Sequence, residues 1–251
     1  MIGLVRNEWK KVFLPVLLTT VLLAIAMGVL SCTIYQNYVL HYDLEAWEVG
    51  TELFSLLYPL FVVVPLCWNL YYERKNNFLL YVMPRVKIKK YLTAKWIAYA
   101  LGTLCIIVIP YILSAVFALY VKPPVVPFVE NPFSHIFENA FIKTPLLYAV
   151  ALSLWRGTVS LFVMTFGFIL ALYCKNIFVI LTGPFMYSIL ENFVLAILCL
   201  ERLRLVVAFD PTTVNPEVVS IFSFFFGPIV LSIVIGLTAF LLSKKNAVVT
   251  I

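Results

Sequence analysis

The sequence predicts an all-α integral membrane protein with six transmembrane helices. Of its 251 residues, 63% are hydrophobic and only 12% are charged, and the mean hydropathy is +1.03. A water-soluble protein could not cover that much apolar surface with so few charges. Apolar runs recur along the whole chain, and each reaches about 20 residues or more, which is enough for a helix to cross a hydrocarbon core of roughly 30 Å.

The apolar runs lie at about residues 12–35, 53–72, 96–121, 145–173, 177–200 and 218–242. Transmembrane β-strands would appear instead as segments of about 10 residues with strict alternation, and the sequence has no such pattern. We therefore expect a single transmembrane domain that covers residues 1–251.

The first residues, MIGLVRNEWKKVF, have an amphipathic pattern. Five apolar side chains share one helical face, and the charged and polar ones occupy the rest; the apolar set is Ile2, Val5, Trp9, Val12 and Phe13. This pattern predicts a helix over about residues 1–13 that lies in the inner membrane interface. The alternative is that these residues extend the first span into the headgroup region.

The distribution of positive charge predicts that both termini are cytoplasmic. Lys and Arg near the ends of spans remain on the cytoplasmic side. With the N-terminus inside, thirteen Lys and Arg residues fall on the inner face and four on the outer face, and the first outer loop has acidic residues but no Lys or Arg. We therefore expect a multi-pass membrane protein.

We find no pattern of polar residues that predicts a catalytic, cofactor-binding or metal site. His41 and His135 lack zinc-site spacing, and the five cysteines are scattered, mostly within apolar runs. The chain also lacks a glycine-rich phosphate-binding motif, so any ATPase must be another polypeptide. We expect membrane lipid as a partner, and no nucleic acid.

The segment from Glu73 to Trp96 holds seven of the 18 Lys and Arg residues. Within it, an apolar cluster over residues 78–83 stands between asparagines and Pro84. This predicts a short helix, ended by Pro84, whose apolar side chains insert into a groove on a cytoplasmic partner. The alternative is that the cluster packs on the inner headgroups while the lysines contact anionic lipid.

This loop, residues 73–95, resembles the intracellular loop of ABC-2-type permeases, the membrane subunits of ATP-binding cassette exporters. The matching elements are Glu73 after the second span, a short helix over 77–83, Pro84 with Arg85, and Lys95 at the start of the third span. Residues 145–185 resemble the fourth and fifth spans of small Gram-positive members, and FDPTTVNP at 209–216 corresponds to the outer loop before their last span. Asn77, where the family often has Gly, and the charge of Arg156 depart from the pattern.

The resemblance implies an exporter with two permease chains, identical or different, and two cytoplasmic ATPase chains that bind ATP and Mg. The 73–90 loop would then be the coupling helix. Its expected ATPase-coupling residues are Glu73, Asn77, Phe78, Leu80, Tyr81, Pro84 and Arg85. The implied cargo is an amphipathic or hydrophobic peptide, in bacteriocin-like export or immunity, and the implied location is a bacterial plasma membrane. The alternatives are a membrane sensor or regulatory subunit without transport, and a membrane-embedded lipid enzyme.

The first span has small residues at every fourth position, Ala24, Gly28 and Cys32. Small residues allow helix backbones to approach closely in a membrane, so this stripe is a candidate seam between two permease chains. Packing within one chain is the alternative.

Arg156 and Glu191 are the charges that lie well inside apolar runs. A lone charge in the membrane is costly, so each should have a partner. Their depths in two antiparallel spans agree to within one helical turn, which predicts an ion pair between Arg156 and Glu191. The alternative is that each side chain reaches the outer headgroups or a water-filled vestibule separately.

Overall fold

The computed structural model describes residues 1–82, 84, 86–125 and 135–245. Every regular element in these ranges is helical. The elements are α1 (Ile2–Thr33), η1 (Ile34–Asn37), α2 (Glu45–Lys75), α3 (Phe78–Val82), α4 (Ile88–Tyr120), α5 (Glu138–Lys143), α6 (Pro145–Tyr173), α7 (Ile177–Ile197), η2 (Glu201–Leu203), α8 (Leu205–Phe209), η3 (Pro211–Thr213) and α9 (Ile221–Lys245).

Six helices are long and apolar enough to cross a membrane, namely α1, α2, α4, α6, α7 and α9. The predicted all-α class is thereby confirmed, and the six predicted apolar segments each correspond to a helix long enough to span a membrane. The bounds of α6 coincide with the predicted 145–173, whereas α2 and α4 begin earlier than expected. The first turns of both helices pack against other helices, since Trp47 and Tyr91 are buried. This packing explains why the helices include polar residues that precede the apolar runs.

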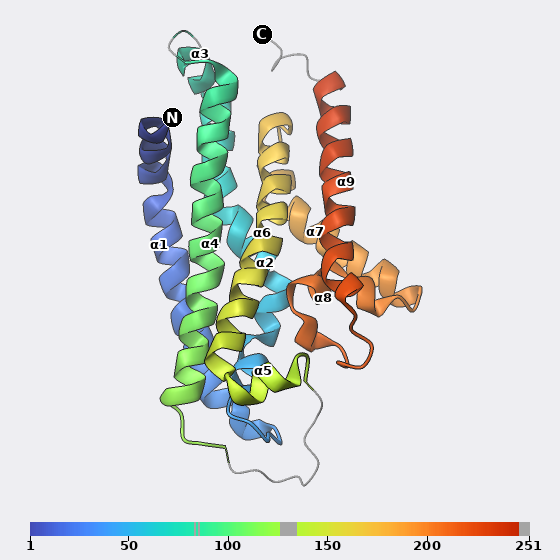
Figure 1. Ribbon diagram of the computed structural model, residues 1–251. Coiled ribbons are helices and arrows are strands. Elements are labelled where there is room, and N and C mark those ends of the chain that lie inside the picture. The colour runs from blue at the N-terminus through green and yellow to red at the C-terminus, as the bar shows by residue number, and fades with distance from the viewer. Residues whose placement is uncertain (83, 85, 126–134, 246–251) are drawn as a thin grey trace.

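The long helices form a bundle in which α1 packs along α4, and α4 also packs against α6 (Figure 1). The helix α2 contacts α1, α4, α6 and α7, so it holds the centre of the bundle. The start of α1, the short helix α3 and the last turns of α9 lie at one end, which we call the α3 end (Figure 1). The helix α5 lies at the opposite end, the α5 end.

The helices α1 and α2 approach each other closely at Gly50. A Cβ atom at Gly50 would lie 2.4 to 2.6 Å from the Oγ, Cα and N atoms of Ser31. Two of these are backbone atoms, so no side-chain rotation could relieve the clash. Glycine at this position is therefore a requirement of the packing between the two helices.

The predicted interfacial helix over residues 1–13 is not a separate element. Residues 2–13 are the first turns of α1, which continues through Pro15 to Thr33. Glu8 lies on the charged face of the predicted amphipathic helix but is buried, 3.2 Å from Lys95 Nζ of α4. This contact packs the charged face against the bundle, so the structure agrees with the alternative, in which these residues extend the first span.

The sequence predicted an outer loop at residues 209–216, but the connection between α7 and α9 enters the bundle instead. The helix α8 lies midway along the bundle (Figure 1), and all five of its residues are buried. The chain returns toward the α5 end through η3 before α9 begins. Residues 205–211 thus form a segment that re-enters the bundle.

We predict that Gly50→Ala lowers the free energy of unfolding by about 1–3 kcal/mol, the usual cost of overpacking. The measurement is the thermal transition of the purified protein in detergent. Gly236→Ala is the matched control, because a Cβ atom there meets nothing within 4 Å. Equal melting temperatures for the two variants would contradict the close approach of α1 and α2.

The buried position of α8 predicts a protection pattern in cysteine labelling. Single cysteines would be placed at Val207, which is 2% exposed, and at the exposed Glu217, in a chain whose native cysteines are replaced by serine. In intact cells, a membrane-impermeant maleimide should modify the cysteine at 217 and leave that at 207 unmodified until the protein is denatured. Rapid labelling at both positions would mean that residues 205–211 form an outer loop.

Candidate functional site

Arg156 and Asp210 form an ion pair in the interior of the bundle. Arg156 Nη2 lies 2.7 Å from Asp210 Oδ1, and neither side chain is exposed. Asp210 Oδ1 also accepts hydrogen bonds from the hydroxyl and the backbone N–H of Thr212. The carboxylate therefore caps η3 and neutralises the charge of Arg156 at the same time.

Aromatic rings surround the Arg156 guanidinium. Its carbon lies 4.7 Å from the ring centre of Trp47 in α2 and 4.4 Å from that of Tyr111 in α4. Cation–π contacts of this kind strengthen when water is excluded. Trp47 Nε1 donates to the Tyr111 carbonyl and to Ser114 Oγ, so α2 and α4 are joined directly beside the charge.

Three further contacts hold α8 in place. The Tyr58 ring stacks on Phe209 at 3.9 Å with an interplanar angle of 5°. Trp155 Nε1 of α6 donates to the Ala208 carbonyl at 2.7 Å. The backbone N–H of Leu205 donates to both carboxylate oxygens of Glu191, at 3.0 Å each. The re-entrant segment is thus fixed by α2, α6 and α7.

The predicted ion pair between Arg156 and Glu191 is therefore wrong. Glu191 is used at the start of α8, where the first backbone N–H groups of a helix lack partners within it. The prediction compared depths in two adjacent spans and treated residues 209–216 as an outer loop. Because α8 re-enters the bundle, it brings Asp210 to Arg156 in place of Glu191.

A second buried cluster of charges lies toward the α3 end. Lys95 of α4 has a fully buried side chain and contacts both Glu73 of α2 and Glu8 of α1. Lys11 Nζ lies 2.6 Å from Glu8 and 3.0 Å from Glu73, and the Tyr91 hydroxyl donates to the same two carboxylates. The charges of two acidic and two basic side chains thus compensate one another, and buried charges are tolerated when they are paired in this way.

The helix α3 follows this cluster after a sharp turn. Asn77 has a φ of 56°, in the left-handed region that glycine and asparagine adopt most readily. The turn explains why Asn can occupy a position where the resembling family often has Gly. The side chains of Phe78 and Tyr81 are 39% and 74% exposed, and Lys11 Nζ lies 5.0 Å from the centre of the Phe78 ring.

The other residues predicted for coupling are placed only in part. Pro84 is exposed in the turn after α3. Arg85 and the side chain of Leu80 lie outside what the structure describes, so their predicted role stays a prediction. Glu73 joins α2 to other helices, since it contacts Lys11 of α1 and Lys95 of α4.

At least two residues of the predicted dimer seam on α1 contact α4 of the same chain. A Cβ atom at Gly28 would lie 3.0 Å from the Phe117 ring of α4, and Cys32 Sγ lies 3.9 Å from the Phe117 carbonyl. Ala24 is half-buried. Gly28 and Cys32 thus serve packing within one chain, which was the alternative, because the small side chains let α1 and α4 approach.

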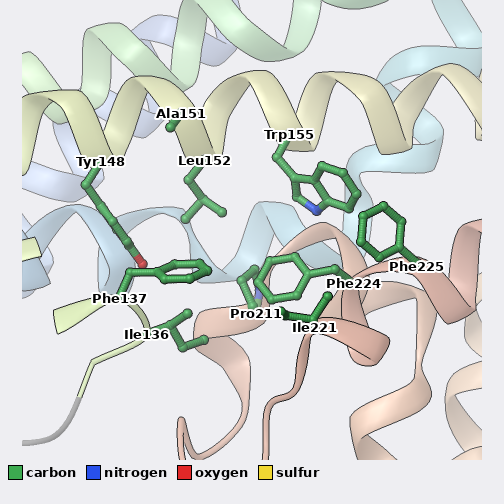
Figure 2. A pocket seen from close by; sticks show the side chains of 10 residues that line it. All are labelled: Ile136, Phe137, Tyr148, Ala151, Leu152, Trp155, Pro211, Ile221, Phe224 and Phe225. Carbon is green, nitrogen blue, oxygen red and sulfur yellow. The ribbon is translucent and has the colours of Figure 1, made fainter. Parts of the chain in front are cut away.

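Two adjoining hollows lie at the α5 end. The first, which we call the apolar hollow, has a volume of about 290 Å³; its larger lining side chains are Phe137, Tyr148, Leu152, Trp155, Phe224 and Phe225 (Figure 2). The second, the polar hollow, has a volume of about 310 Å³ and is lined by Glu48, His135 and residues 212–216 among others. Ile136 lines both, and Pro211 of the first precedes Thr212 of the second.

Glu48 and His135 line the polar hollow, and Glu45 contacts His135 from behind this wall. His135 Nε2 lies 2.9 Å from Glu45 Oε1, and its Nδ1 lies 3.7 Å from Glu48 Oε2. Glu45 also accepts backbone N–H bonds from His41 and Tyr42. Glu48 Oε1, by contrast, has no hydrogen-bond partner within the described ranges. No cluster of the described residues has the geometry of a metal site.

Sequence reasoning missed Asp210, Glu8 and the pairing of His135 with Glu45. Asp210 stands in a segment rich in proline and threonine that is typical of an exposed turn, and Glu8 stands on the polar face of an amphipathic pattern. A signal for Asp210 was available in the charge balance, because Arg156 required an acidic partner. Nothing in the sequence distinguished Asp210 from Glu191 as that partner.

We predict that Arg156→Met and Asp210→Asn each destabilise the protein strongly, by roughly 3–5 kcal/mol, because each leaves one buried charge unpaired. The double variant should lose clearly less than the sum of the two, as measured by thermal unfolding in detergent. The matched cycle combines Arg156→Met with Glu191→Gln and should show little coupling. A larger coupling in the Glu191 cycle than in the Asp210 cycle would contradict the pair seen here.

Comparisons of this chain with protein-family models, with curated proteins and with solved structures find no match. What the chain does must therefore be argued from its own residues and their arrangement.

Proposed function

We propose that this chain is the permease subunit of an ATP-binding cassette exporter that moves amphipathic peptides out of the cell. The observation that carries the proposal is α3, a short helix between the second and third spans that displays Phe78 and Tyr81 above a buried cluster of charges. A separate ATPase would supply the energy, since the chain has no nucleotide-binding motif.

The exposed aromatic side chains of α3 support a protein partner. The helix projects past the start of α1 at the α3 end (Figure 1), so it extends from the bundle instead of covering it. Aromatic side chains on a short helix suit insertion into a groove on a partner, where they contribute strongly to binding. Many Lys and Arg residues of the chain belong to this end, which favours the cytoplasmic side.

The buried charges offer a route from α3 into the bundle. Glu73 lies in the last turn of α2, just before the Asn77 turn, and contacts Lys11 of α1 and both Tyr91 and Lys95 of α4. A displacement of α3 by a closing ATPase would therefore act on three spans together. Motion of rigid helices about such contacts is a known way to switch access to a pathway.

In the proposed assembly, two permease chains join two ATPase chains, which bind ATP and Mg. The contact between the permease chains would have to use a surface other than Gly28 and Cys32, because these face α4. The buried Arg156–Asp210 pair would keep charge out of contact with lipid in the outer half of the bundle.

The proposal predicts that Phe78→Asp combined with Tyr81→Asp weakens docking of the ATPase. The permease would be expressed with any ATP-binding cassette ATPase that a neighbouring gene encodes, and copurification and ATP hydrolysis would be measured. Loss of two exposed aromatic anchors should weaken association at least about tenfold. Tyr120→Asp is the matched control, since Tyr120 is 70% exposed at the other end of the bundle.

Unchanged association in the double variant would contradict the role of α3. A membrane sensor without transport would fold normally yet show no ATPase partner, so wild-type protein that never copurifies with the neighbouring ATPase would favour that alternative.

A further inference from the structure

The two adjoining hollows at the α5 end combine an apolar wall with an incompletely paired carboxylate. We propose that together they bind a cationic amphipathic peptide, with one apolar side chain in the apolar hollow and a neighbouring Lys or Arg side chain beside Glu48. The choice of a peptide rests on the proposed function, whereas the chemistry of the site follows from the residues that line it.

The apolar hollow is suited to a single bulky side chain. Tyr148, Leu152 and Trp155 of α6 point toward Phe137 and Phe224 across it (Figure 2). Its volume of about 290 Å³ is at the lower end of the range for organic ligands, roughly 300–1,000 Å³. Aromatic walls bind an aromatic or aliphatic side chain through the large apolar area that they bury.

The polar hollow is lined by an acidic side chain, Glu48, that the protein leaves partly unpaired. Glu45 is satisfied by His135 and two backbone N–H groups, but Glu48 Oε1 has no hydrogen-bond partner within the described ranges, and the Glu48 side chain is only 14% exposed. A shielded carboxylate with one oxygen unpaired is costly, so an ammonium or guanidinium close to Glu48 would be favoured.

Other nearby charges do not supply that cation. Arg156 is already paired with Asp210, and Lys122 is paired with Asp43 at 2.6 Å. The imidazole of His135 is engaged by Glu45 and stacks on Phe141 at a ring separation of 3.9 Å. None of these three groups therefore donates to Glu48 Oε1.

Because the two hollows adjoin, the apolar group and the cation of a ligand that fills both must lie close together. Ile136 lines both hollows, and Pro211 of the first is followed directly by Thr212 of the second. Neighbouring side chains of a peptide meet that requirement. A zwitterionic phospholipid fits less well, since its phosphate would approach Glu45 and Glu48.

The test is a binding titration with purified full-length protein in an uncharged detergent, without any ATPase. The probe is a fluorescent amphipathic peptide of leucine and lysine, followed by anisotropy. The control peptides have lysine replaced by glutamate, or leucine replaced by serine. We expect the leucine–lysine peptide to bind and both controls to bind at least about tenfold more weakly.

Two variants locate the site on the protein. Glu48→Gln removes the carboxylate charge and should weaken binding about tenfold, while Glu138→Gln, an exposed acid of α5 that lines neither hollow, should leave binding unchanged. Ala151→Phe places a ring at the exposed mouth of the apolar hollow and should weaken binding by a similar factor. Thermal unfolding of each variant checks that it is folded.

Absence of binding by the wild-type protein would overturn the inference, as would equal affinity for the lysine and glutamate peptides. Equal effects of Glu48→Gln and Glu138→Gln, or wild-type affinity in Ala151→Phe, would place the peptide elsewhere. Displacement of the peptide by dihexanoyl phosphatidylethanolamine would identify a lipid site instead. Because no ATPase is present, these results are independent of the docking experiment on α3.

Discussion

Arg156 and Asp210 meet in the interior of the bundle, where neither side chain contacts solvent. Transfer of each charge from water costs several kcal/mol, so neighbouring groups must offset part of that cost. The rings of Trp47 and Tyr111 cover the guanidinium, and Thr212 donates to the carboxylate. The need to bring these groups together accounts for the re-entry of α8 between α7 and α9.

The pair also gives α2 and α4 a central place in the molecule. Trp47 and Tyr111 belong to these helices and are joined by a hydrogen bond beside Arg156. The same two helices carry Glu73 and Lys95, which meet in the cluster next to α3. Two neutralised groups of buried charges, one toward each end, therefore fix the register of α2 against α4, and a change at one group can reach the other through rigid helices.

The part of the fold that depends on local composition could be predicted from the sequence. Spans were found because apolar length is a property of one segment, and the bounds of α6 were correct because Pro145 suits the first turn of a helix and Asn176 caps the helix that follows it. The partners of buried charges could not be predicted in this way. Asp210 caps η3 through the same oxygen that binds Arg156, so its sequence context is that of an ordinary turn. Glu8 is buried only because Lys95 approaches from α4, which an amphipathic pattern cannot reveal.

The position of Glu48 connects the proposed peptide site with this framework. Glu48 follows Trp47 directly in α2, and Trp47 lies on the guanidinium of Arg156. A cation beside Glu48 would repel Arg156 and attract Asp210, because charges act over longer distances where water is excluded. Peptide binding at the α5 end would then alter the strength of the Arg156–Asp210 ion pair, which holds α8 in the bundle. In the proposed exporter, α2 would sense the cargo at Glu48 and the ATPase through Glu73, so one helix would couple the two events.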